Sequence, residues 1–380
     1  MKKLHFPFCL FSLLMLVSSC RNVVSPDDVV YITGGDAVST MFDAIVTDCS
    51  VEPLTSDLPL DASTMIVRGN TILMSNSDRS KLQFLQDNRL VSELSAKGRG
   101  PGEYSMINSY TYCPESSVVF LSSVSKQDVL CYDAATMRYI GCIPSDCFVS
   151  ELCMLDDSTL LAVRYLDDEG NCLAAVDIHT GESEKLCDLS QSESSMYFYP
   201  QSASQYEIAY SVNNFISKIC YIGNDDACHE FQKFCFTDGM PEDMFNQGNG
   251  EEFTDESLSY ISYSFSEHYY GGIFMPLITD DGYTFWYANH NSPSQDSWDC
   301  LYRKSGDRII QAKNITIPGI KNYIEPDGLT DDGRYFTVFA GTSDMLEDPE
   351  VNPSDLARQI LDAVDAQNDC NPVVLYYRIK

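Results

Sequence analysis

A glycine-rich segment is the first part of the sequence that could carry chemistry. Residues 97–104 read KGRGPGEY, with a glycine at every second position around Arg99. Backbone N–H groups of such a segment can surround an anion, and the Arg99 side chain would be its nearest charged contact. The segment lacks the Gly-Lys-Ser/Thr ending and the following helix of a phosphate-binding loop. We therefore favour a shaped connection in which Arg99 and Glu103 pair with neighbouring groups, and keep both as candidate ligand contacts.

Groups that could perform catalysis are sparse. The chain contains no Gly-x-Ser-x-Gly elbow and no His-Glu-x-x-His sequence. Two acid pairs, Asp280-Asp281 and Asp331-Asp332, offer oxygen ligands for calcium, but each pair precedes a glycine. Asp-Gly is typical of a hairpin turn, because the turn needs positive φ. We assign no catalytic residue, and we expect His179, within the Asp-Ile-His-Thr-Gly sequence, to lie beside a turn.

Trp298 is a candidate for ligand stacking. It ends a polar stretch, residues 290–298, that begins with His290 and is expected to form a loop. An exposed indole can stack on a sugar ring or grip a peptide, so Trp298 and His290 are candidate ligand contacts. The alternative is that Trp298 folds back onto its own sheet. The insertion 237–259, acidic with Met and Phe residues, is either a docking flap or a solvated loop.

Repeated β-like runs must position these residues. Six short apolar runs, each preceded by a polar turn, begin at Thr71, Val118, Thr159, Tyr206, Tyr283 and Tyr335. The intervals between them are 47, 41, 47, 77 and 52 residues, and a four-stranded propeller blade takes about 40–50 residues. The long interval contains the 237–259 insertion. The spacing predicts an all-β, six-bladed β-propeller over residues 60–380, ahead of an array of β-sandwiches.

The C-terminal region predicts one helix before a closing strand. Ser354 is a plausible N-cap, and Leu356, Ile360, Leu361 and Val364 recur at helical spacing. Asn371-Pro372 ends this short amphipathic helix, and residues 373–380 form a last strand that completes the ring. In the N-terminal half, residues 20–59 are expected to be a tether, with an edge strand at Ala44-Ile45-Val46.

The N-terminus resembles an export signal. Lys2 and Lys3 precede an apolar stretch that is too short for a comfortable membrane span, and Val17-Ser18-Ser19-Cys20 ends it. This ending resembles a bacterial lipobox, so residues 1–19 are interpreted as a lipoprotein signal peptide and Cys20 as the site of lipid attachment. A plain signal peptide or an uncleaved anchor is the alternative. The anchor predicts the cell envelope, on the periplasmic side or at the surface.

Charge and cysteine content exclude some classes of function. With 24 Lys and Arg against 56 Asp and Glu, the net charge of −32 would repel nucleic acid. The 15 cysteines match no zinc-binding spacing, and most are expected to be small buried residues of strands, with one or two disulfides permitted.

The chain resembles a known family. The segment 97–104 is similar to the Gly-x-Gly-Pro-Gly-Glu-aromatic signature of the TolB-like six-bladed β-propeller lipoproteins of Bacteroidetes. Asn371-Pro372 before a strand ending in Lys380 resembles the C-terminus of that family, and Cys20 also fits. The resemblance covers about residues 60–380 and implies the fold and an outer-membrane or other envelope location, without an activity. The cysteines and the 237–259 insertion depart from it.

These features predict a binding module. We expect a lipid-anchored, non-enzymatic propeller that binds a protein, peptide or glycan of the envelope, with no cofactor and with membrane contact through the anchor only. The alternative is a calcium-assisted hydrolase of lactonase or esterase type, with its site in the central channel.

Overall fold

The computed structural model describes most of the chain. The described residues are 29–166, 170–189, 198–200, 206–213, 216–223, 225, 227–241, 269–291, 295–367 and 371–380. The signal peptide, Cys20 and all of the 237–259 insertion after residue 241 therefore lie outside the described residues. None of the helices in the described ranges is both long and apolar enough to cross a membrane.

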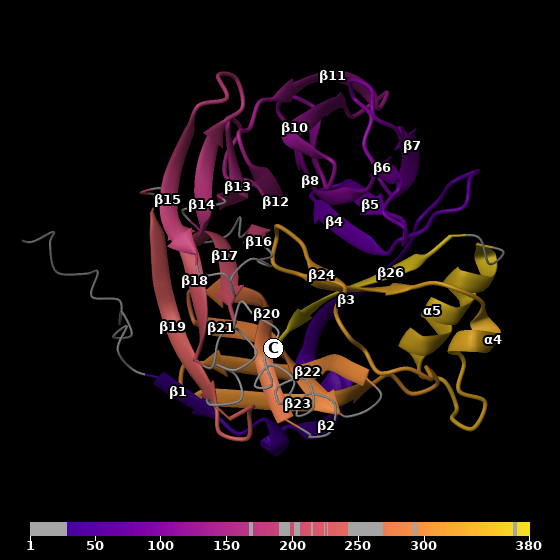
Figure 1. Ribbon diagram of the computed structural model, residues 1–380. Helices are drawn as coiled ribbons and strands as arrows, with labels where there is room; N and C mark the ends of the chain where they lie inside the picture. Colours follow the sequence, from indigo (N-terminus) through magenta and orange to yellow (C-terminus); the bar gives the residue numbers. More distant parts are fainter. Residues whose placement is uncertain are drawn as a thin grey trace, which may run out of the picture.

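Six β-sheets are arranged around an axis as the blades of a propeller (Figure 1). The first three blades each contain four consecutive antiparallel strands. Blade 1 contains β4 (Thr64–Arg68), β5 (Thr71–Ser75), β6 (Leu82–Gln86) and β7 (Arg89–Leu94). Blade 2 contains β8 (Ile107–Cys113), β9 (Val118–Ser123), β10 (Lys126–Asp133) and β11 (Arg138–Ile143). Blade 3 contains β12 (Phe148–Met154), β13 (Thr159–Leu166), β14 (Gly170–Asp177) and β15 (Ser183–Leu189).

The last three blades each gain a strand from the N-terminal segment. Blade 4 contains β16 (Phe198–Pro200), β17 (Tyr206–Val212), β18 (Ser217–Gly223), β19 (Cys228–Phe236) and β1 (Val29–Ile32). Blade 5 contains β20 (Tyr269–Thr279), β21 (Gly282–Asn291), β22 (Gln295–Ser305), β23 (Arg308–Thr316) and β2 (Val38–Met41). Blade 6 contains β24 (Gly328–Leu329), β25 (Tyr335–Phe339), β26 (Val373–Ile379) and β3 (Val46–Pro53).

The six apolar runs of the sequence lie in the second strands of the six blades, so the six-bladed architecture is confirmed. In β5 every residue is buried, because this strand lies within its sheet and is covered on both faces. A short, continuous apolar run is the pattern of a strand buried on both faces. Trp286, in β21, is fully buried in the core.

The N-terminal segment is part of the propeller. Strands β1 and β2 pair in parallel with β19 and β23, and Figure 1 shows them along the outer edges of blades 4 and 5. The turn η1 (Gly34–Asp36) between them is held by Asp238, whose carboxylate accepts hydrogen bonds from Gly34 N at 2.7 Å and Gly35 N at 2.8 Å. The predicted edge strand is shifted: Ala44 and Ile45 end the helix α1 (Phe42–Ile45), and Val46 begins β3.

Both chain ends close the ring in blade 6. Strand β26 is the third strand of this blade, and β3 pairs antiparallel with it as the fourth and outermost strand. The C-terminal strand therefore lies inside the last sheet, and the N-terminal strand β3 covers its edge.

The predicted helix is confirmed as α5 (Asp355–Ala366), which lies with α4 (Ser343–Leu346) outside blade 6 (Figure 1). Ser354 Oγ accepts a hydrogen bond from Ala357 N at 3.1 Å, which satisfies one free donor of the first turn. The buried face of α5, with Ile360, Leu361 and Val364, joins the core between blades 5 and 6.

Candidate functional site

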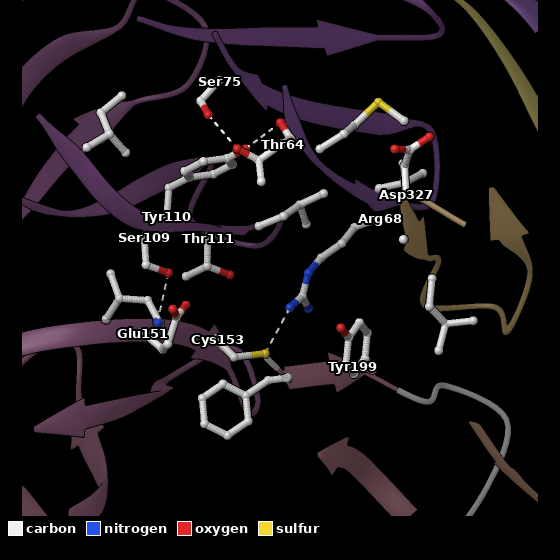
Figure 2. A pocket seen from close by; sticks show the side chains of 18 of the residues that line it. Thr64, Arg68, Ser75, Ser109, Tyr110, Thr111, Glu151, Cys153, Tyr199 and Asp327 are labelled. Carbon is white, nitrogen blue, oxygen red and sulfur yellow. Dashed lines mark hydrogen bonds between the residues drawn. The ribbon is translucent and has the colours of Figure 1, made fainter. Parts of the chain in front are cut away.

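A cavity of about 280 Å³ lies on the propeller axis. Residues of the first strand of every blade line it: β4, β8, β12, β16, β20 and β24. In β4 the less buried residues alternate with Met65 and Val67, which places Ile66 and Arg68 on the face towards the cavity. Figure 2 shows polar side chains from blades on different sides of the axis pointing into this space. The cavity is therefore the place where the fold brings distant parts of the chain together.

Arg68 is the central cation of the cavity (Figure 2). Its Nη2 donates to Cys153 Sγ at 3.3 Å, whereas its buried Nε has no hydrogen-bond partner. No ion pair of Arg68 occurs among the residues that the structure describes. A guanidinium has five N–H donors and stays protonated in proteins, so this side chain has unused capacity to bind.

Two hydroxyl groups accompany Arg68 in the cavity wall. Thr111, in β8, is 1% exposed, and its Oγ1 has no hydrogen-bond partner. Tyr110 donates from its hydroxyl to Thr64 O at 2.7 Å, and burial raises the pKa of this phenol to about 12. Leaving a buried polar atom without a partner costs free energy, so the bare Thr111 hydroxyl marks a position that suits a ligand atom.

Two carboxyl groups also face the cavity, from β12 and from the residue before β24. Burial raises the pKa of Glu151 to about 8, although a hydrogen bond with Ser109 and the charge of Arg79 oppose the rise. Burial also raises the pKa of Asp327, whose Oδ2 accepts a hydrogen bond from Val338 N at 2.6 Å. At neutral pH Glu151 is mainly protonated, so the cavity holds less negative charge than its residue types suggest.

The comparison with known families agrees with this architecture. A profile of a family described as a 6-bladed beta-propeller matches residues 56–266 of the chain. The chain belongs to this family. No curated protein matches the chain in sequence.

Solved structures similar to this six-bladed propeller include proteins of two Bacteroides species. One is a Bacteroides fragilis protein inferred to be exported, at 17% identity and a TM-score of 0.65, with 93% of this chain and 100% of that chain covered. Another, a DUF4221-family protein from Bacteroides vulgatus, has 10% identity and a TM-score of 0.46, with coverages of 88% and 97%. At such low identity the first likeness concerns the fold alone, and the second is too weak to support an argument.

We expect Glu151→Gln to change how the stability of the propeller depends on pH. The folded state keeps the Glu151 proton to about pH 8, whereas an unfolded chain releases it near 4.5. The folded state therefore binds more protons in this window, and this group makes stability fall as pH rises, by at most about 1.4 kcal/mol per pH unit.

Urea titrations from pH 4.5 to 8.5 measure the free energy of unfolding at each pH. This free energy should decline less steeply with pH in the Glu151→Gln variant than in the wild type, and it should be greater in the variant at pH 8.5. Glu115→Gln, at an exposed turn position of blade 2, is the matched control and should follow the wild type. Parallel curves for Glu151→Gln and the wild type would show that this carboxyl titrates normally.

The glycine-rich segment of this propeller binds its own side chain. The Glu103 carboxylate accepts hydrogen bonds from Arg99 N at 2.8 Å and Gly100 N at 2.7 Å. A Cβ at residue 98 would lie 2.1 Å from Glu103 Oε2, so glycine at that position makes room for the carboxylate. The anion nest considered from the sequence thus contains Glu103 and shapes the connection between blades 1 and 2. A ligand role for the exposed Arg99 stays a prediction.

We expect Gly102→Ala to destabilise this connection. Gly102 has φ +68°, and an added Cβ would lie 2.4 Å from the Tyr139 ring. Positive φ costs about 1–2 kcal/mol with a side chain, and the forced overlap adds about 1–3 kcal/mol. Gly69→Ala is the control, because Gly69 has φ +55° with open space around its Cβ position. Chemical denaturation should show a larger loss for Gly102→Ala, and equal losses would contradict the steric argument.

The other two predicted ligand contacts belong to strands of blade 5. His290 lies near the end of β21, and Trp298 lies in β22, so the expected polar loop is wrong at this position. The side chains of both residues lie outside the described part of the chain, and their ligand role stays a prediction. His179 is exposed in the turn after β14, where its N donates to Asp177 Oδ1 at 2.9 Å, as expected.

The acid pairs act as turn residues. Asp281 Oδ1 accepts from Thr279 Oγ1 at 2.7 Å, and Asp332 accepts from Thr330 Oγ1 at 2.5 Å. Asp281 and Asp332 also pair with Arg303 and Arg378. In the described ranges no three His, Cys, Asp or Glu side chains gather as metal ligands. Calcium takes six to eight oxygen ligands, so these residues alone do not build its site.

Cysteine packing follows the sequence prediction. Eight of the twelve described cysteines are buried. Sequence reasoning missed Arg68, Thr111 and Glu151, since the three residues lie in separate strands and none of them is part of a local motif. Arg68 and Glu151 could have been found by assigning the first strand of each blade and then selecting every second residue of that strand as facing the axis.

Proposed function

We propose that this six-bladed propeller is a lipid-anchored protein of the cell envelope that binds a ligand in its axial cavity without transforming it. The ligand is a small polar molecule or the end of a peptide or glycan chain. The observation that supports this proposal is a cavity lined from six blades that contains unpartnered polar atoms, Arg68 Nε and Thr111 Oγ1. Binding sites are typically concave, with few precisely placed polar groups among apolar ones.

The proposed location rests on the N-terminal sequence. The lipobox-like run ending in Cys20 supports lipid attachment, and the resemblance to TolB-like lipoproteins of Bacteroidetes supports the outer membrane. The similar B. fragilis protein, which is inferred to be exported, agrees with secretion.

We expect Cys20→Ala to release the protein from membranes. Acyl chains contribute about 0.8 kcal/mol for each buried CH₂ group, so a diacylated cysteine holds a protein stably on a bilayer. Fractionation of cells should find the wild type with membranes and the variant in the soluble fraction. Cys49→Ala, at an exposed cysteine of β3, is the matched control. Membrane association of the Cys20→Ala variant would contradict lipid attachment.

The binding proposal is tested by thermal-shift and calorimetric titrations. The panel contains amino acids, short peptides, mono- and disaccharides, and calcium with and without EDTA. A ligand at a hundredfold excess over Kd stabilises the folded state by about 2.7 kcal/mol. Ile66→Trp should fill the cavity and abolish binding, whereas Ile140→Trp, at an exposed site of β11, should not. Binding unaffected by Ile66→Trp would place the ligand elsewhere, and a calcium shift reversed by EDTA would favour the hydrolase.

A further inference from the structure

The chemical class of the ligand follows from the groups that the cavity leaves unpartnered. This inference rests on the proposed binding function and specifies it. Arg68 reaches into the cavity from β4, and its only hydrogen bond in the described residues goes to the weak acceptor Cys153 Sγ. Its buried Nε has no acceptor. A buried guanidinium N–H without an acceptor costs free energy, unless a bound anion supplies the missing acceptor.

Thr111 is an independent observation on the neighbouring blade. Its side chain is almost entirely buried, and its Oγ1 lies in the cavity wall without a partner. A hydroxyl can donate one hydrogen bond to an oxygen atom of a ligand. Blades 1 and 2 therefore present a guanidinium and a neutral hydroxyl to the same space, and Arg68 Nε and Thr111 Oγ1 both lack a partner.

We propose that the axial cavity binds a carboxylate, with the Arg68 guanidinium as the charged anchor and the Thr111 hydroxyl as a second donor. A planar carboxylate accepts two parallel hydrogen bonds from a guanidinium, which gives strength and orientation. The rest of the ligand lies among the apolar residues of the same walls, such as Ile66, Met275 and Leu329.

The acids of the cavity distinguish a carboxylate from a phosphate. Glu151 and Asp327 face the same space, and burial raises the pKa of Asp327. The lining holds two cations, Arg68 and Arg79, and an ionised Asp327 offsets one of them. One further negative charge then balances the cavity, whereas a dianion would exceed this balance. A neutral sugar hydroxyl would satisfy Thr111 and leave the Arg68 charge without a counter-ion. The charge balance of the cavity therefore favours a monoanion.

The test uses three monocarboxylic acids and their matched amides: N-acetyl-L-alanine, butyrate and glucuronate against N-acetyl-L-alanine amide, butyramide and glucuronamide. Inorganic phosphate is a further probe, and Kd is measured by calorimetry at pH 7 on the full chain. We expect at least one acid to bind, its amide to bind 10-fold to 100-fold more weakly, and phosphate to compete poorly.

Variants assign the anchor. Arg68→Gln should weaken the binding of the acid 10-fold to 100-fold and leave the amide unchanged, with Arg68→Lys between them. Thr111→Val removes the second donor at nearly constant volume and should cost about 3-fold to 10-fold. Arg138→Gln, at an exposed position of β11, is the matched control and should bind like the wild type. Thermal melts of all variants without ligand confirm that they are folded.

The pH profile adds a readout that misfolding would not produce. Affinity for the acid should fall as pH rises through about 8, because ionised Glu151 adds negative charge to the cavity. Glu151→Gln should remove this fall. The other titratable or charged groups of the cavity lining are Arg68, Arg79, Tyr110, Cys153, Tyr199 and Asp327.

Three results would overturn the carboxylate assignment. They are equal affinity for acids and amides, wild-type affinity in Arg68→Gln, and tight binding of phosphate through Arg68. Loss of binding in Arg99→Gln with retention in Arg68→Gln would move the anion site to the glycine-rich segment. Binding of neutral ligands alone would overturn this inference and keep the proposed function, whereas no binding of any ligand class would overturn both.

Discussion

A chain that begins at residue 54 is expected to lose the folded propeller. The truncation removes β1, β2 and β3, and with them the outermost strand of blade 6. Strand β26 would then expose an edge along its pairing with β3, from Val373 opposite Pro53 to Ile379 opposite Val46. Phe42 and Ile45, both buried in the core between blades 5 and 6, would also be lost. An exposed edge and an opened core favour aggregation over a closed ring.

Circular dichroism and size-exclusion chromatography measure this outcome. The truncated chain should show no cooperative thermal transition and should elute as aggregate. A chain that begins at residue 29 keeps all three strands and serves as the control. A chain that begins at residue 46 keeps β3 alone and separates the closure of blade 6 from the pairing of β1 and β2. A cooperative, monomeric fold of the chain that begins at residue 54 would show that the propeller folds without the N-terminal segment.

This dependence on the N-terminal segment was the part of the fold that the sequence concealed. Strands β5, β9 and β13 are predictable because each is a short apolar run after a polar turn, a local signal. The parallel pairing of β1 with β19 joins Val29 to Lys233, about two hundred residues apart, and β1 has only four residues. Such long-range pairing depends on the assembled blades and has no local signature.

The candidate site was hidden for a related reason. Arg68, Thr111 and Glu151 belong to three different blades, and none of them is part of a local motif. Their meaning appears only when the ring closes and the first strands face one axis. The glycine-rich segment was conspicuous in sequence because its backbone geometry is unusual, yet its glycines serve the Glu103 carboxylate and the approach of Tyr139. The local motif therefore predicted only a local backbone shape. The cavity could not be predicted without knowing how the blades are arranged around the axis.

The closure of blade 6 depends on Tyr377, and Tyr377→Ala is expected to lower the free energy of unfolding by about 3–5 kcal/mol. Tyr377 is 1% exposed in β26, where its ring meets Phe42 edge-on at 5.1 Å and stacks near Tyr335 at 6.1 Å. Removing the ring leaves a cavity between α1 and blade 6 that the neighbouring strands cannot fill without moving. Tyr323→Ala, at a side chain that is 51% exposed, is the matched control and should cost less than about 0.5 kcal/mol.

A double-mutant cycle with Phe42→Ala then tests whether the two chain ends stabilise each other. Phe42 and Tyr377 are in ring contact. The two single variants should therefore lose, in sum, about 0.5–1.5 kcal/mol more unfolding free energy than the double variant loses. Urea unfolding of the four proteins measures this coupling. Additive losses would mean that α1 and β26 are stabilised independently. The N-terminal helix α1 would then not contribute to the closure of blade 6. A measurable coupling would make the ring contact between the two ends part of the closure itself, alongside the strand pairing of β3 with β26.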